Sequence, residues 1–304
     1  MLTAFVILIL FAMLNDYSYK KINWEFTQNN SDTILSDGLY KLKTRPYQLF
    51  SDVEDAGFGN YLISHNKINY YVGEGKELNK RLKQQFKPTT STFYKNLIKL
   101  QKINGTIANI AIDKFKVQAI TTNIGRKEIE EFGISNLPTI LNRFQLDKRK
   151  THNVADQEGL WDKVQKAKAE ILLRAEQEIL KEKFTLWSDC NMEKVAGIYI
   201  VRNDNKLLYI GESSDIFERF STHSNRTYFS ALRRHIGTEI LNFELHERNG
   251  KKKYFEVNED KKVTEFLKSC KASFYPTHFG RYELEEFLIK KYRPLLNRKD
   301  NKED

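Results

Sequence analysis

The stretch KVAGIYIVRNDNKLLYIGESSDIFER, residues 194–219, decides the fold of this 304-residue chain. Two apolar, β-branched runs, 195–202 and 206–211, flank an Asn-Asp-Asn triplet that is typical of a hairpin turn. A helix is expected to begin at Ser214 or Asp215, because both residue types cap helix N-termini. The pattern therefore predicts a β-hairpin that leads directly into a helix.

The same pattern occurs earlier in the chain, which predicts a tandem duplication. Five pairs lie 138 positions apart: Gly59 and Gly197, Tyr61 and Tyr199, Tyr71 and Tyr209, Gly73 and Gly211, and Arg81 and Arg219. Downstream, residues 126–132 and 141–143 match 281–287 and 296–298 at an offset of 155. Between these blocks, Thr92-Phe93-Tyr94 is aligned with Thr227-Tyr228-Phe229 at an offset of 135. The second copy therefore carries about 17 additional residues between its halves.

The repeats give a four-part plan of the chain: residues 1–19, 20–150, 151–190 and 191–304. The first part contains an apolar run, Met1 to Leu14, which lacks the basic start and cleavage site of an export signal. It is also shorter than a membrane span, so a buried terminal helix or a misassigned start codon is expected. The third part is predicted to be one long amphipathic helix over 156–187, entered at Asp156-Gln157-Glu158. Intramolecular packing of this helix is favoured over a dimerisation arm.

Composition restricts the classes of function. The net charge of +10 and a pI near 9.3 favour a polyanionic partner such as nucleic acid, although solvated basic faces are the alternative. Two cysteines, Cys190 and Cys270, exclude a disulfide framework and a four-cysteine zinc site. We therefore expect a cytoplasmic protein with no stable membrane partner.

The C-terminal copy resembles the GIY-YIG nuclease superfamily over residues 193–299. The features that carry the resemblance are Gly197-Ile198-Tyr199, Tyr209-Ile210-Gly211, Arg219, His223, Glu285 with Leu288-Ile289, and Pro294 with Asn297. The resemblance implies an α/β (α+β) chain of two GIY-YIG-type domains joined by the long helix. Each domain would be a small, mainly antiparallel sheet flanked by helices.

The resemblance also implies a metal-dependent DNA endonuclease whose catalytic residues are Tyr199, Tyr209, Arg219, His223, Glu285 and Asn297. Glu285 would be the metal ligand, because a single carboxylate can hold Mg²⁺ or Mn²⁺ that keeps waters in its shell. Arg219 would bind phosphate through its rigid donor fork, and His223 lies one helical turn further on. Tyr199 is predicted as base or proton relay with Tyr209 as its partner, while Asn297 would brace the site.

The N-terminal copy keeps a nominal second site formed by Tyr61, Tyr71, Arg81, Glu130 and Asn142. It departs from the pattern where Gln85 stands in place of the histidine, and where Gly133-Ile134 weakens the helix that carries the glutamate. We expect a decayed or DNA-gripping copy rather than a second working site.

Basic clusters predict a surface for DNA. The residues chosen are Lys251, Lys252 and Lys253 in a hairpin turning at Asn249-Gly250, and Arg233 and Arg234 in a helix over 226–236. A restriction-like or mobile-element role is favoured. The alternatives are a non-catalytic nucleic-acid-binding protein and a structure-selective DNA repair nuclease. A homodimer is the second option if each chain has one active site.

Overall fold

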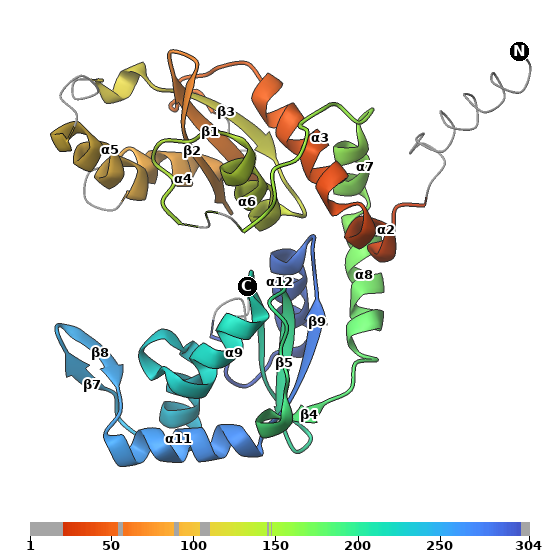
Figure 1. Ribbon diagram of the computed structural model, residues 1–304, viewed down its shortest axis with the longest axis vertical. Coiled ribbons are helices and arrows are strands. Elements are labelled where there is room, and N and C mark those ends of the chain that lie inside the picture. Colours follow the sequence, from red (N-terminus) through yellow and green to blue (C-terminus); the bar gives the residue numbers. More distant parts are fainter. Residues whose placement is uncertain are drawn as a thin grey trace, which may run out of the picture. The chain divides into compact units, whose positions relative to one another are not determined.

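The computed structural model describes residues 21–53, 57–87, 91–103, 110–144, 146 and 148–298. The chain divides into two compact units between Ile171 and Leu172 (Figure 1). Within the described residues, no helix is both long and apolar enough to cross a membrane. The apolar run at residues 1–14 lies outside the described residues.

The first unit is built on a three-stranded antiparallel sheet in the order β2-β1-β3. Its strands are β1 (Gly59–His65), β2 (Ile68–Gly75) and β3 (Lys116–Thr121). Its helices are α2 (Trp24–Asn29), α3 (Ser31–Thr44), α4 (Leu78–Gln85), α5 (Thr92–Ile103), α6 (Arg126–Asn136) and α7 (Leu160–Lys166), with a 3-10 turn, η1, at Ile112–Lys114.

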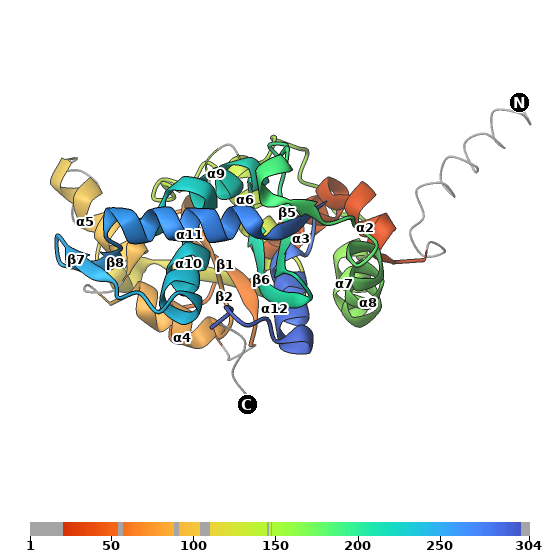
Figure 2. The same ribbon diagram turned by 90° about the horizontal axis from the view of Figure 1, so that it is seen from below.

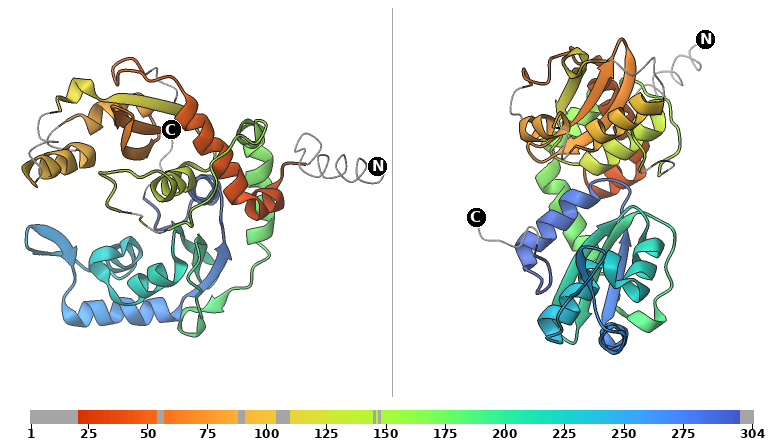
Figure 3. Two further views of the ribbon diagram at one scale, coloured as in Figure 1. Left: turned by 45° about the horizontal axis from the view of Figure 1, so that its top comes forward. Right: turned by 90° about the vertical axis from the view of Figure 1, so that its left-hand side faces the viewer.

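The second unit has a four-stranded antiparallel sheet in the order β4-β9-β5-β6. Its elements are α8 (Lys168–Ile179), which begins before the boundary, β4 (Thr185–Leu186), η2 (Trp187–Asp189), β5 (Gly197–Asn203), β6 (Lys206–Ser213), α9 (Ile216–Asn225), η3 (Thr227–Phe229), α10 (Ala231–His235), η4 (Ile236–Ile240), β7 (His246–Arg248), β8 (Lys251–Tyr254), α11 (Val257–Ser269), β9 (Lys271–Pro276) and α12 (Arg281–Tyr292). Helix α11 lies against α9 and α10 (Figure 2). Helix α12 packs on the opposite side of the sheet from α9 (Figure 3).

Both units contain the predicted order strand, strand, helix, helix, strand, helix, but in the second unit β7, β8 and α11 stand between the second of these helices and the last strand. Their strand registers also correspond. Tyr61 pairs with Gly73 and Ala119, and Tyr199 pairs with Gly211 and Phe274. Each hairpin has an irregularity two residues after its first tyrosine. The offsets of 138 and 155 seen in the sequence are therefore the offsets of the strand pairing.

A glycine beneath each first tyrosine explains one part of the shared motif. A Cβ at Gly211 would lie 2.2 Å from the Tyr199 hydroxyl, and one at Gly73 would lie 2.4 Å from that of Tyr61. Both tyrosines are buried in the cores of their units. No side chain larger than a hydrogen fits on the neighbouring strand, so the ring lies directly on the backbone.

The prediction of a single long linker helix over residues 156–187 is wrong. The helix is interrupted at Ala167 between α7 and α8, and it ends at Ile179 rather than near Trp187. The predicted entry at Asp156 is also replaced, since Gly159 is the N-cap in a left-handed conformation. Buried Asp37 of α3 accepts hydrogen bonds from the Gln157 and Trp161 amides, at 2.8 and 2.7 Å. A side chain more than 100 residues away thus satisfies helix N–H groups that local caps usually serve.

The predicted helix over 226–236 is broken by Ser230, which caps α10 after the short turn η3. In the first unit, Ser91 accepts a hydrogen bond from the Tyr94 amide in the first turn of α5. The two serines correspond, so the sequence alignment at an offset of 135 is displaced. The hairpin turn at Asn249-Gly250 is confirmed, with both residues at positive φ as a tight hairpin turn requires.

We expect Gly211→Ala to lower the free energy of unfolding by about 1–3 kcal/mol, because the new methyl group overpacks the buried tyrosine. Urea unfolding measures the change. In a Tyr199→Val background, where the ring is absent, the same substitution should cost less. Equal losses in both backgrounds would contradict the ring as the cause.

Candidate active site

The hydroxyl of Tyr199 is the centre of the candidate site in the second unit. It lies 2.7 Å from His223 Nε2, and it accepts a hydrogen bond of 3.3 Å from Arg219 Nε. Both partners come from α9 and lie four residues apart, so they share one helix face. The ring of Tyr209 stacks beside that of Tyr199, with centroids 6.0 Å apart. Four of the predicted catalytic residues are thus brought together.

The tautomer of His223 follows from its second nitrogen. Nδ1 lies 2.6 Å from Ser230 Oγ, which already accepts a bond from the Arg233 amide. The buried serine therefore satisfies its hydroxyl hydrogen by donating to Nδ1, and Nε2 carries the ring hydrogen and donates to Tyr199. Burial, followed by Arg219 and Arg233, lowers the pKa of His223 well below its usual 6.5. The ring is neutral at physiological pH.

Tyr199 is a protonated phenol at rest. Burial raises its pKa well above 10, and neighbouring Tyr209 raises it further, while Arg219 lowers it. Two donors, Arg219 and His223, point at its oxygen, so its own hydrogen is directed away from both of them. This arrangement stabilises negative charge on the oxygen whenever the proton leaves.

A cavity of about 330 Å³ adjoins this tyrosine pair. It is lined by Tyr209, Glu212, Arg219, Ala231, His235, Tyr282, Glu285, Ile289, Asn297 and Arg298. Glu285 Oε1 accepts a hydrogen bond from the Glu212 amide at 3.1 Å, and the Glu212 carboxylate receives Arg281 Nε at 2.8 Å. Two carboxylates, two guanidinium groups and two phenols therefore line one hollow.

Asn297 has a structural role, because its side chain hydrogen-bonds to the backbone of β6 rather than pointing at the reacting centre. Its side-chain oxygen accepts a hydrogen bond from the Ile210 amide at 2.9 Å, and its NH₂ group donates to the Ile210 carbonyl at 2.8 Å. The side chain thus pairs with β6 as a neighbouring strand would, and it holds the Tyr209-Ile210-Gly211 segment in place. Asn142 makes the same two bonds with Val72, both at 2.9 Å.

The residues at this hollow fit a divalent cation that keeps most of its water. Among the described residues, no group of three or more histidine, cysteine or acidic side chains could hold a metal. Glu285 lines the cavity and Glu212 joins it, and oxygen donors of this kind suit Mg²⁺ and Mn²⁺. The cavity has room for the waters that complete such a shell.

The first unit repeats the tyrosine geometry with an amide in place of the imidazole. Gln85 Nε2 donates to the Tyr61 hydroxyl at 2.8 Å, and Gln85 Oε1 accepts from Ser91 Oγ at 2.9 Å and the Phe93 amide at 3.2 Å. The backbone donor fixes which end of the amide is oxygen. The hydrogen bonds therefore run in the same direction as in the second unit: the serine hydroxyl donates to the helix side chain, which donates to the tyrosine oxygen. The ring of Tyr71 stacks beside that of Tyr61, with centroids 6.3 Å apart.

The acidic part of the first unit differs. Lys127 Nζ lies 3.1 Å from Glu74 Oε1 and 3.4 Å from Glu130 Oε2. Burial raises the pKa of Glu130 to about 7, an effect that Lys127 opposes and Glu74 adds to. The residue at the position of Lys127 in the second unit is Tyr282. The lysine was not identified from the sequence, although it lies inside the matched block that begins at Arg126.

Arg233 does not fit the predicted role of contacting DNA. It is fully buried, and its guanidinium donates to Thr227, to Asp260 and to the carbonyl oxygens of His223 and Ser224. Arg234 is partly buried and donates to the Thr227 and Tyr228 carbonyls. Arg233 and Arg234 thus connect neighbouring segments inside the second unit.

The hairpin lysines are accessible. Lys251 and Lys252 are exposed and Lys253 is half-buried, and Lys251 Nζ donates to the Tyr228 hydroxyl at 2.8 Å. The sequence analysis missed Glu212 and Arg281 of the site. The sequence contained a signal for both, since Glu74 and Arg126 stand at the matching offsets of 138 and 155 in the first unit.

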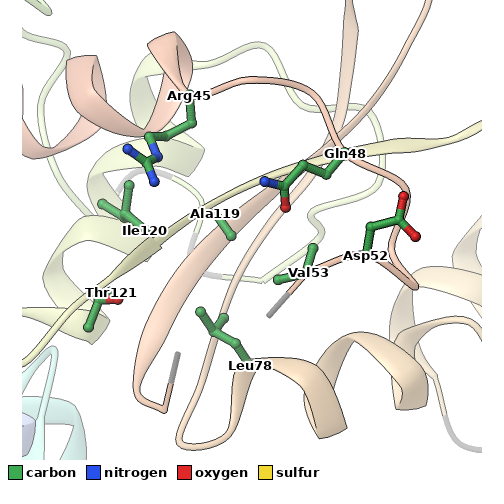
Figure 4. Close-up of a pocket in the computed structure, with 8 residues that line it drawn as sticks. All are labelled: Arg45, Gln48, Asp52, Val53, Leu78, Ala119, Ile120 and Thr121. Carbon is green, nitrogen blue, oxygen red and sulfur yellow. The ribbon is translucent and has the colours of Figure 1, made fainter. Parts of the chain in front are cut away.

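Another cavity, of about 180 Å³, lies in the first unit beside β3 and the start of α4 (Figure 4). Its lining residues are Arg45, Gln48, Asp52, Val53, Leu78, Ala119, Ile120 and Thr121. None of the predicted site residues lines it, so it is separate from the tyrosine site of that unit.

Residues 180–304 match the GIY-YIG catalytic domain family. This part of the chain is a GIY-YIG catalytic domain, a class that carries out nuclease-type phosphodiester hydrolysis on nucleic acid and generally uses a divalent metal ion. The match does not extend to residues 59–142. No curated protein and no solved structure matches the chain.

We expect His223→Gln to keep DNA cleavage within about tenfold of wild type, because glutamine supplies the same N–H donor to Tyr199. His223→Ala removes that donor and should cost about 10²–10³ in rate. Single-turnover cleavage measures both, and the pH–rate profile between pH 5 and 8 should be the same for wild type and His223→Gln. An acidic limb that disappears with the glutamine would instead make the histidine a titrating base.

The raised pKa of Glu130 predicts a pH-dependent stability of the first unit. The folded value of about 7 exceeds the ordinary 4.5, so the folded state binds the proton more tightly. Its contribution to stability is present below pH 4.5 and is lost as the pH rises through 7. Thermal melts should therefore show stability falling between pH 5 and 8, and Glu130→Gln should flatten that fall. An unchanged slope in the variant would contradict the assignment.

Proposed function

We propose that the protein is a metal-dependent DNA endonuclease whose working site is the hollow of the second unit. The proposal is carried by Arg219, which hydrogen-bonds to Tyr199 beside His223 and also lines the cavity that Glu285 lines. A phosphodiester needs a water made nucleophilic, a positive partner for the charge that develops on phosphorus, and a proton for the leaving oxygen. The residues at this cavity include a group suited to each task.

Arg219 binds and orients the scissile phosphate. Its Nε hydrogen bonds to Tyr199, and it lines the cavity, so the guanidinium is held at the place where a phosphate oxygen would enter. The planar fork gives this contact a fixed geometry.

Tyr199 acts as the proton relay between water and solvent or substrate. Its phenol is protonated at rest, and the hydrogen bonds from Arg219 and His223 stabilise the oxyanion when it gives up that proton. Tyr209 stacks beside Tyr199 and lines the cavity, so it is the member of the tyrosine pair that would contact the substrate.

Glu285, with Glu212 beside it, would hold Mg²⁺ or Mn²⁺. When bound, the ion supplies Lewis acidity and charge neutralisation at the phosphate. The Glu212 amide bond to Glu285 Oε1 fixes the direction of the carboxylate, and Arg281 fixes Glu212 in turn. These contacts orient the ligands before any substrate arrives.

We also propose that the first unit is a divergent copy of the second. The support comes from strand registers at offsets of 138 and 155, from the glycine under each tyrosine, and from the paired asparagine bonds. Left-handed glycines at Gly125 and Gly280 also precede α6 and α12, respectively. The same proposal divides the chain into a first domain at residues 20–150, a linker at 151–190 and a second domain at 191–304.

Within the nuclease class, a restriction-like or mobile-element role is the biological setting we favour, on the weight of His223 and the basic hairpin at Lys251–Lys253. The alternative is a structure-selective repair nuclease, which would cut flaps or lesions and spare intact duplex. A single working site per chain favours a homodimer for double-strand breaks. We assign the protein to the cytoplasm because both cysteines are free thiols.

Nicking of supercoiled plasmid with Mg²⁺ or Mn²⁺ tests the proposal. Glu285→Gln should reduce the rate by about 10³-fold or more, because the carboxylate that holds the ion is lost while the volume is kept. Glu286→Gln, one residue along the same helix, is the matched control and should cut as wild type. Absence of cutting by wild type on intact, flapped and damaged DNA would favour a non-catalytic nucleic-acid-binding protein.

A further inference from the structure

The acidic corner of the first unit contains an ammonium group. Lys127 Nζ bridges Glu74 and Glu130 at 3.1 and 3.4 Å, and the three side chains are 12–23% exposed. Arg126, almost fully buried, lies 3.9 Å from the other carboxylate oxygen of Glu74, Oε2. The cluster is therefore a salt-bridge network inside the fold rather than a solvated surface pair.

The same corner of the second unit has no lysine. Glu212 and Glu285 occupy the positions of Glu74 and Glu130, and Arg281 occupies that of Arg126. Tyr282, at the position of Lys127, instead lines the cavity beside Glu285. The two corners thus share their carboxylates and differ in what neutralises them.

We propose that Lys127 takes the place of the divalent cation in the first unit, which makes this unit a metal-independent binding site for a DNA phosphate. This inference rests on the proposed function of the second unit for its DNA ligand. It does not rest on that unit's activity, because it concerns residues of the first unit alone.

The ion pairs of the two corners support the substitution. In the second unit Arg281 pairs with Glu212, and Tyr282 brings no charge to the position of Lys127. In the first unit Arg126 approaches Glu74, and Lys127 Nζ adds a positive charge between Glu74 and Glu130. A phosphate would therefore meet a cation at this position without a metal, and a divalent cation would meet an ammonium already between its two carboxylate ligands.

The chemistry of an ammonium group explains why this unit would bind without cutting. Lysine offers three N–H donors to phosphate oxygens, but it has no vacant orbital to polarise phosphorus and no exchangeable water. Arg81 lies near Tyr61 as Arg219 lies near Tyr199, so a phosphate would find the same guanidinium. The site keeps the parts that bind and loses the part that activates water.

Manganese stoichiometry tests the replacement directly. Titration of the full chain with Mn²⁺, followed by electron paramagnetic resonance, should show one more bound ion in Lys127→Tyr than in its parent. The comparison is made in wild type and in Glu285→Gln, so the gain is scored whether or not the second unit holds an ion. Lys127→Met is the second variant if the tyrosine does not fold, as judged by circular dichroism.

No gain of a manganese ion in either folded variant would overturn the proposal. So would an ion in the Glu285→Gln protein that is lost on Glu130→Gln, because it would place a metal in the first unit with Lys127 present. Loss of nicking alone bears on the second unit only, which keeps the two failures apart.

Binding of duplex DNA in EDTA tests the phosphate half. In the Glu285→Gln background, Lys127→Met should weaken affinity about tenfold and lower the dependence of binding on salt by about one counterion. Lys83→Met, at an exposed position of α4, removes an equal charge and should change affinity far less. Equal effects of the two substitutions would reduce the role of Lys127 to general surface charge and overturn this half.

Discussion

A buried tyrosine ring resting on a glycine is the constraint on which the rest of each unit depends. The ring can be buried only because the neighbouring strand has no Cβ at that point. Once buried, its hydroxyl needs hydrogen-bond partners, because an unsatisfied polar group in a core is costly. The first helix after the hairpin supplies those partners, and the serine that caps the next helix orients one of them. The burial of the tyrosine ring on the glycine therefore accounts both for the packing of the hairpin and for the hydrogen bonds to the tyrosine hydroxyl.

The comparison of His223 with Gln85 shows which properties are needed in the side chain that lies between the serine and the tyrosine. Both side chains accept from a serine hydroxyl and donate to a tyrosine oxygen. The requirement is directional, an acceptor at one end and a donor at the other, and a titratable ring is only one way to meet it. The two units also differ at their acidic corners, where Lys127 lies between Glu74 and Glu130 and Tyr282 stands at the matched position.

Much of the architecture could be predicted from the sequence, because the repeat fixes strand pairing through two constant offsets. The hairpins, the tight turn at Asn249-Gly250 and the order of the elements follow from local patterns. The linker was misjudged because Asp37, far away in sequence, supplies the amide acceptors at its start. Arg233 was misjudged because composition does not reveal that a guanidinium is enclosed by carbonyl oxygens. Both depend on contacts between distant segments.

The asparagine pairs have a consequence for biosynthesis. Ile210 is held by Asn297, 87 residues downstream, and Val72 by Asn142, 70 residues downstream. These bonds to β2 and β6 cannot form until the asparagine has been synthesised, since loop closure must come first. On the ribosome, the first unit can close while the second is still incomplete. The second unit completes its bonds to Ile210 only after Asn297 has emerged, so in a partly synthesised chain the Tyr209-Ile210-Gly211 segment of the candidate site is not yet held by them.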